Sequence, residues 1–104
     1  MSTFTDYITQ EAKDQRDLLI SIMPESGFHT TFSMEVGYTA STFPKDGIEF
    51  CFQQNPETEK YVAYLIDHYN EKYLDFFVVD LEATKENIVE SLDKAYEYIE
   101  LNNL

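Results

Sequence analysis

The sequence predicts an α+β fold: a small antiparallel β-sheet of three or four strands with an amino-terminal and a carboxy-terminal helix packed on it. Three observations favour this class. Apolar residues recur at helical spacing towards both ends of the chain, apolar and polar residues alternate in the middle, and the few glycines and prolines fall between these stretches. The chain has 104 residues, and we expect residues 1–104 to form a single domain around one core.

The first helix is expected near the amino terminus. Thr3 can cap the amides that follow it, while Pro24 and Gly27 interrupt the helical pattern. We therefore place the first helix between residues 4 and 22. Its apolar face consists of Phe4, Ile8, Ala12, Leu19 and Ile22.

Two strands are expected after this helix. Residues 28–38 place apolar side chains at every second position, which is the period of a strand with one buried face. Residues 48–53 repeat the alternation, and Pro44-Lys45-Asp46-Gly47 between them is typical of a turn. We therefore predict one strand over residues 28–38 and another over residues 48–53.

Residues 56–70 fit two interpretations. With Asn55 as N-cap and Pro56 in the first turn they would form a helix, and the element order would be α-β-β-α-β-α. The same start also suits a turn, and residues 61–66 are rich in strand-forming side chains. Residues 68–72 would then close a hairpin onto a strand over residues 73–79, which gives the order α-β-β-β-β-α. We favour the strand.

The last helix carries the most informative pattern in the chain. Thr84 is its expected N-cap, and the helix should run to about Asn102. Acidic residues recur in it at spacings of four, three, four and three, which places their carboxylates along one helical face. This acidic stripe consists of Glu86, Glu90, Asp93, Glu97 and Glu100, and the opposite face consists of Ile88, Leu92, Ala95 and Ile99.

The acidic stripe is unfavourable for the helix itself. Like charges four residues apart destabilise a helix by about 0.2–0.5 kcal/mol per pair, and Lys94 alone offers compensation within the stripe. Glu97 and Glu100 also lie in the last turn, where the helix dipole disfavours anions. The stripe is therefore expected to bind a partner, although a solvated surface face is the alternative.

Composition narrows the classes of partner. Twenty acidic against seven basic residues give a net charge of −13, which repels phosphate backbones and anionic lipid surfaces. Direct binding of nucleic acid or membrane is therefore not expected. The single cysteine, Cys51, fits a reducing compartment, and residues 1–6 lack the pattern of a signal peptide, so we expect a cytoplasmic protein.

The sequence indicates no catalytic, cofactor or metal site. Cys51 lies two residues from Glu49, whose charge would raise the pKa of the thiol rather than activate it. His29 and His68 show no metal-ligand spacing, and a site built from His68 with nearby aspartates is the less favoured alternative to ordinary surface residues. Phosphate-binding loops and known nucleophile motifs are absent. We therefore expect that the protein is not an enzyme.

These observations favour a small acidic inhibitor that occupies the basic surface of a nuclease or another nucleic-acid-handling protein. In size and charge, though in no motif, the chain resembles phage anti-defence proteins and nuclease immunity proteins. A DNA mimic would need carboxylates from other elements as well, because five charges along about 21 Å have under half the charge density of duplex DNA. Tyr98, at the border of the two helical faces, is the expected aromatic anchor. The expected partner-binding residues are Glu86, Glu90, Asp93, Glu97, Tyr98 and Glu100.

Two other functions fit the composition. Acidic cytosolic secretion chaperones are also small α+β proteins, and they form homodimers that hold an effector segment on exposed apolar strips. Alternatively, the acidity confers only solubility. Binding by the inhibitor should weaken with salt, binding by the chaperone should survive salt, and a merely soluble protein should bind nothing.

Overall fold

The computed structural model describes residues 10–23, 27–33 and 37–104. Over these residues the chain is an α+β fold with seven elements. In chain order they are α1 (Gln10–Ile22), β1 (His29–Ser33), β2 (Gly37–Lys45), β3 (Ile48–Gln54), β4 (Tyr61–Asp67), β5 (Lys72–Leu81) and α2 (Lys85–Leu101).

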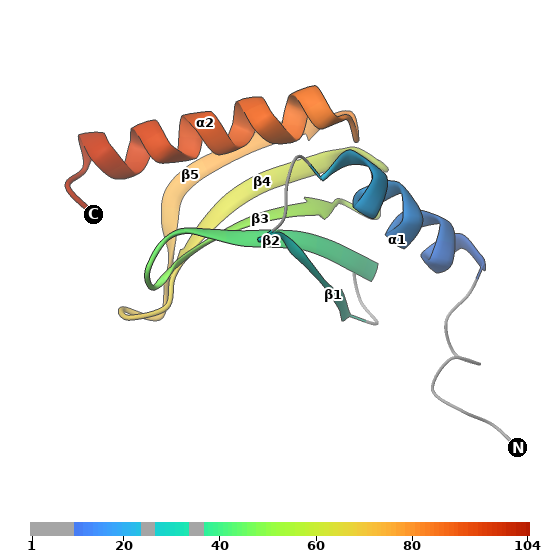
Figure 1. Cartoon of the computed structure of the whole chain (residues 1–104), viewed down its shortest axis with the longest axis horizontal. Helices are drawn as coiled ribbons and strands as arrows, with labels where there is room; N and C mark the ends of the chain where they lie inside the picture. Colours follow the sequence, from blue (N-terminus) through green and yellow to red (C-terminus); the bar gives the residue numbers. More distant parts are fainter. Residues whose placement is uncertain (1–9, 24–26, 34–36) are drawn as a thin grey trace, which may run out of the picture.

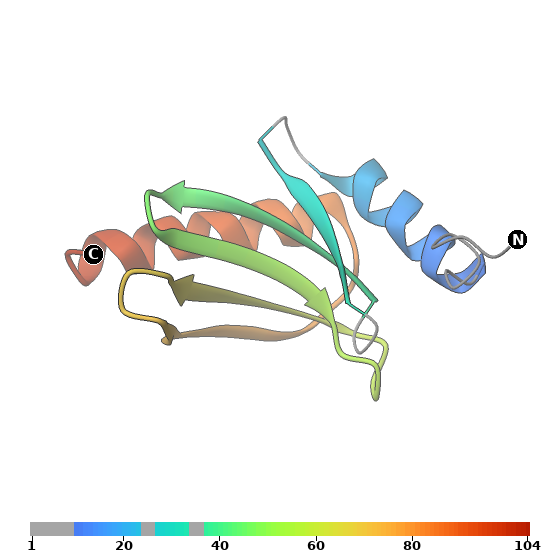
Figure 2. The same ribbon diagram turned by 90° about the horizontal axis from the view of Figure 1, so that it is seen from below.

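The described strands form one antiparallel sheet in the order β1-β2-β3-β4-β5, so each strand pairs with its neighbours in sequence. Helix α2 lies across the sheet and contacts β2, β3, β4 and β5, whereas α1 packs beside β1 and β2 (Figure 1). Both helices contribute to the same core. The opposite face of the sheet is covered by neither described helix (Figure 2) and is called the helix-free face below.

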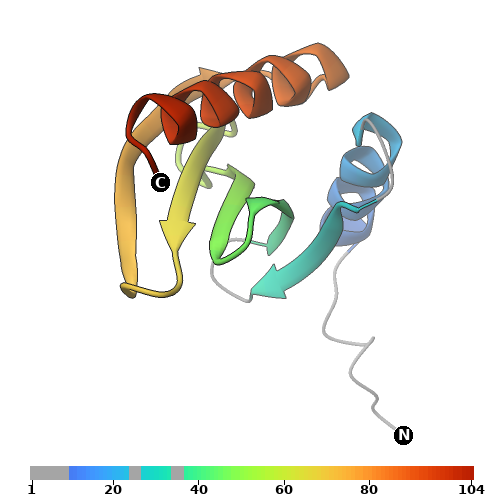
Figure 3. The ribbon, with the colours of Figure 1, turned by 60° about the vertical axis from the view of Figure 1, so that its left-hand side comes forward.

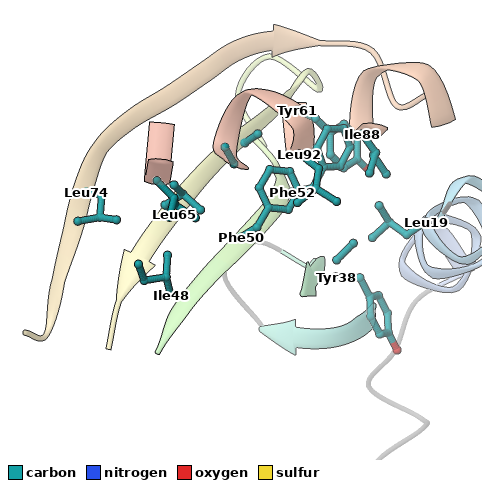
Figure 4. Close-up of a cluster of buried hydrophobic side chains, with 14 residues drawn as sticks. Leu19, Tyr38, Ile48, Phe50, Phe52, Tyr61, Leu65, Leu74, Ile88 and Leu92 are labelled. Atoms are coloured by element: carbon teal, nitrogen blue, oxygen red, sulfur yellow. The ribbon is translucent and has the colours of Figure 1, made fainter. Parts of the chain in front are cut away.

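The core lies between the sheet and the helices. In β3, the alternation seen in the sequence directs Phe50 and Phe52 towards α2, where both are fully buried. The ring of Phe52 stacks on that of Tyr61 in β4, with centroids 4.9 Å apart. Leu19 of α1 and Ile88 of α2 both belong to this buried cluster (Figure 4), so the two helices pack on the same core.

Helix α1 is held on the sheet by a polar side chain. Gln15 Oε1 accepts a hydrogen bond from the backbone N–H of Tyr38 at 2.9 Å, and Gln15 Nε2 donates to Gln54 Oε1 at 2.9 Å. Gly37 makes this approach possible, because a Cβ at that position would lie 2.4 Å from Gln15 Oε1. The backbone of Gly37 also has a φ of +80°, which side chains disfavour.

Two details of the predicted sheet are wrong. Residues 28–38 do not form one strand, because Ser33 of β1 pairs with Gly37 of β2 and the chain reverses between them, so the described sheet has five strands rather than three or four. Alternation alone hides such a hairpin, since both arms keep a period of two. The turn expected at residues 44–47 is also shorter: β2 continues through Pro44 to Lys45, at a register shift between Thr42 and Lys45 that tolerates proline.

The other element predictions are confirmed where the structure describes them. Residues 61–67 form β4, so the α-β-β-α-β-α order is wrong. The Asn55 side chain accepts from the Glu57 N–H at 3.0 Å and builds a turn in place of a helix cap. Thr84 caps α2 as expected, with its Oγ1 accepting from the Asn87 N–H at 3.2 Å, and Asn102 ends the helix. The predicted start of the first helix at residues 3–8 lies outside the described residues.

Candidate protein-binding surfaces

The acidic stripe lies on the outer face of α2. Helix α2 packs over one face of the sheet (Figure 3). All five carboxylates of the stripe are exposed, while the opposite side of the helix contains its buried residues. Those buried residues are Ile88, Ser91, Leu92, Ala95 and Ile99. The predicted exposure of the stripe therefore agrees with the structure.

Little positive charge compensates the stripe. Among the described residues its one ion pair joins Lys94 Nζ to Glu90 Oε1 at 3.3 Å, and such an exposed pair contributes only about 0.3–0.5 kcal/mol. The last turn of α2 contains no basic residue. Lys45 of β2 approaches this end of the molecule and donates to the carbonyl of Leu104, which offsets part of the negative charge there. Most of the stripe therefore faces solvent unneutralised.

The two tyrosines beside the stripe differ in solvent exposure. Tyr98 is half-buried, and its ring packs on Phe76 of β5 with centroids 5.6 Å apart. This position fits the expected border placement, and its role as an anchor stays a prediction. Tyr96, on the other border of α2, is 49% exposed. The same helical geometry that places Tyr98 at one border of the stripe places Tyr96 at the other, and Tyr96 was not among the predicted partner-binding residues.

Carboxylates elsewhere do not all extend the stripe. Asp75 of β5 is exposed on the helix-free face, and Glu49 of β3 points to that face as well. Glu82, just before α2, pairs with Lys60. Asp75, Glu49 and Glu82 therefore do not add free charge to the row of carboxylates on α2.

A second candidate surface lies on the helix-free face, where apolar side chains of β4 and β5 gather. Tyr73 is 65% exposed, Phe77 57% and Val79 60%. The ring of Tyr64, from β4, lies 5.7 Å from that of Tyr73 and 6.5 Å from that of Phe77. We call Tyr64, Tyr73, Phe77 and Val79 the aromatic strip.

A hollow of about 400 Å³ adjoins the aromatic strip and is lined by residues of all five described strands. This surface was not predicted from the sequence. The available signal was the run of residues 73–79, in which Asp75 is the one charged residue and both strand faces are otherwise apolar. Such a run indicates either burial on both sides or an exposed apolar face.

Two histidines share one carboxylate at the other side of this face. His68 Nε2 lies 2.8 Å from Glu49 Oε1, and His29 Nε2 lies 3.9 Å from Glu49 Oε2. The ring of Phe43 lies 6.4 Å from that of His29 and 5.8 Å from that of His68. Ser41 Oγ is 2.8 Å from the same Nε2 of His29, so one nitrogen faces both neighbours. A catalytic triad needs the two ring nitrogens to serve the nucleophile and the carboxylate separately, and this arrangement does not provide that.

The thiol of Cys51 is shielded on this face. Burial, followed by the charge of Glu49, raises its pKa to about 12, as the sequence predicted in direction. Tyr64, opposite Cys51 on β4, donates its hydroxyl to Gln53 Oε1 at 2.7 Å, and burial raises the pKa of this phenol too. Neither group is ionised near neutral pH.

The carboxylate next to His68 in sequence, that of Asp67, stabilises the fold. Asp67 is buried and accepts hydrogen bonds from the Asn70 side chain at 2.7 Å and from the Tyr69 N–H at 3.0 Å, and the Asn70 bond lowers the pKa of this carboxyl. Asp67 thus closes the β4–β5 turn. Over the part of the chain that is described, no group of three or more His, Cys, Asp and Glu residues is placed to hold a metal ion.

No protein-family model, curated protein or solved structure matches this chain. None of the described helices is long and apolar enough to cross a membrane.

Proposed function

We propose that this protein is an acidic inhibitor that binds the basic surface of a nuclease or another nucleic-acid-handling protein through the acidic stripe of α2. The supporting observation is the row of five exposed carboxylates, of which one has an ion pair within the described residues. We further propose that the chain works without a cofactor and is not an enzyme.

The physical basis of the proposal is electrostatic complementarity. A net charge of −13 accelerates encounter with a cationic surface, and the exposed row on α2 gives that attraction a direction. Glu90, Asp93, Glu97 and Glu100 would lie where phosphates of the nucleic acid otherwise bind. Tyr98 would add apolar contact at the border of the interface.

Charge reversal in the middle of the stripe tests the proposal. The partner is first captured by affinity purification at low salt and identified, and its dissociation constant is then measured with the unaltered chain and with the Asp93→Lys, Glu97→Lys double variant. We expect at least a tenfold loss of affinity, together with elution of the partner at high salt. The matched control is Asp14→Lys with Asp17→Lys, two exposed acids of α1 that change the net charge equally.

Equal loss in the two double variants would show that only total charge matters and not the stripe. Unchanged affinity in the stripe variant, with its circular dichroism spectrum retained, would contradict the proposal. Both variants replace exposed side chains, so the fold should survive in each.

The aromatic strip favours a second candidate function, an acidic secretion-type chaperone that holds an effector segment. Exposed apolar side chains on a sheet face are the surface that such binding requires. This function implies a homodimer in sedimentation experiments and partner binding that persists at high salt. Observing both properties would favour the chaperone over the inhibitor.

A further inference from the structure

The aromatic strip has three properties that together define a binding surface. Its members come from the adjacent strands β4 and β5, and three of the four are more than half exposed. They lie on the helix-free face, away from the acidic stripe. Asp75 lies between Tyr73 and Phe77 in sequence and, by the alternation of buried and exposed residues in β5, on the same face, so the strip carries a carboxylate as well as rings.

The strip also borders an open edge of the sheet. Strand β5 is the last strand in the described order and is ten residues long, with Lys72 at its start as its sole basic residue. Edge strands usually carry lysine, proline or short length as protection against pairing. The pairing of β5 with β4 has two register irregularities, one between Tyr73 and Phe77 and one between Val78 and Leu81. Phe77 and Val79 remain exposed despite them.

We propose that the aromatic strip binds an extended, arginine-containing segment of a protein partner, with an apolar side chain of the segment on Val79. Guanidinium groups would stack on the exposed rings of Tyr73 and Phe77 while Asp75 supplies the opposite charge. The inference rests on the proposed function in one respect, namely that the partner is cationic.

Charge complementarity selects this occupant over a second copy of the chain. Two copies that met at their strips would bring Asp75 of one towards Asp75 of the other, in molecules that each carry a net charge of −13. A purely apolar segment would leave Asp75 desolvated and unpaired. Arginine is favoured over lysine because its planar, weakly hydrated group stacks on aromatic faces.

The test uses a synthetic peptide of five Arg-Val repeats, with Lys-Val and Glu-Val peptides of equal length as matched probes. Each peptide is titrated into the unaltered, isotope-labelled chain, and backbone amide shifts are followed by NMR. We expect the Arg-Val peptide to shift amides of β4 and β5 and to bind several-fold more tightly than the Lys-Val peptide. The Glu-Val peptide should not bind.

Side-chain replacements then assign the contacts. Tyr73→Ala with Phe77→Ala removes both exposed rings without changing charge, and we expect about a tenfold loss of affinity for the Arg-Val peptide. The matched control is Tyr96→Ala, which removes an exposed ring from α2 and should leave affinity unchanged. Asp75→Asn should weaken binding and reduce its salt dependence. These replacements are at exposed positions, and the amide map of the unaltered chain does not depend on them.

The outcomes separate this inference from the proposed function. The Arg-Val peptide could instead shift only amides of α2 and fail to bind the Asp93→Lys, Glu97→Lys variant. That result would overturn the inference and would agree with binding at the acidic stripe. Equal affinity for the Arg-Val and Lys-Val peptides would also overturn the inference. A homodimer in sedimentation experiments that the Phe77→Lys replacement dissociates would overturn it as well. The Asp93→Lys, Glu97→Lys variant could also keep its affinity for the Arg-Val peptide while losing the partner captured by the unaltered chain. That result would support the aromatic strip as a binding site separate from the acidic stripe.

Discussion

Individual side chains show how burial and neighbouring charge decide reactivity in this protein. Cys51 and Glu49 lie two positions apart on β3, and both point to the helix-free face. The thiol is buried, whereas the carboxylate is partly exposed and contacts His68. A buried thiol beside an anion is stabilised in its neutral form, so Cys51 is a poor nucleophile in the folded protein near neutral pH.

The raised pKa of Cys51 gives a prediction with a definite sign. Between pH 7 and 9, alkylation of Cys51 by iodoacetamide should be slow in the folded chain and fast in denaturant, because the folded thiol ionises near pH 12. The unfolded thiol loses its proton near the ordinary value of 9.0, so this group's contribution to stability is complete below that pH and is lost as pH rises towards 12. Mass spectrometry of the alkylated chain measures the rate. Equal rates with and without denaturant would show that the thiol is accessible.

At the scale of the element, the two ends of α2 differ. Thr84 caps the first turn, and Glu86 in that turn is favourable to the helix dipole. The last turn contains Glu100 and no basic residue. The Asn102 side chain donates a hydrogen bond to the Tyr98 carbonyl at 2.8 Å, which satisfies one of the free carbonyls of this turn. The carboxy-terminal half of the helix therefore bears charge that opposes its own stability.

Neutralising that charge should stabilise the protein. We expect Glu97→Gln with Glu100→Gln to raise the free energy of unfolding by about 1 kcal/mol at low ionic strength, since both like-charge repulsion and the unfavourable dipole interaction are removed. Urea denaturation measures the change. The control Glu86→Gln should have the opposite sign, because this residue lies in the first turn. A loss of stability in the double variant would indicate that the stripe supports folding and would weaken the argument for a binding role.

At the scale of the whole molecule, the two faces of the sheet differ in whether helices pack on them. The helices protect one face of the described sheet, and the other face leaves apolar side chains in water. The net charge of −13 keeps such molecules apart, and it also destabilises the compact state through self-repulsion.

Salt should therefore stabilise the folded chain. Raising NaCl from 0.01 M to 0.3 M shortens the Debye length from about 30 Å to below 8 Å, and we expect the free energy of unfolding to increase by on the order of 1 kcal/mol. Thermal or urea unfolding across the salt series measures it. The Asp14→Lys, Asp17→Lys variant, with less charge to screen, should show a smaller increase. A decrease with salt would mean that attractive ion pairs outweigh the repulsion.

Local signals were sufficient for much of this structure. Thr84 and the 3.6-residue period defined α2 because caps and helical faces depend on neighbouring residues, and the exposure of the stripe followed from the same geometry. The reversal between Ser33 and Gly37 was not predictable from alternation, which continues through a hairpin. The aromatic strip was missed for a different reason: which face of a sheet stays open depends on where distant helices pack, and the sequence of β5 does not contain that information.

The shielded thiol also makes the chain convenient to label. Glu57 is exposed in the turn between β3 and β4, remote in sequence from both α2 and β5. A maleimide dye should attach to a Glu57→Cys variant there and leave Cys51 unmodified, so one fluorophore per molecule is obtained without removing the native cysteine. Fluorescence anisotropy of that conjugate would then report the capture of a partner at nanomolar concentrations.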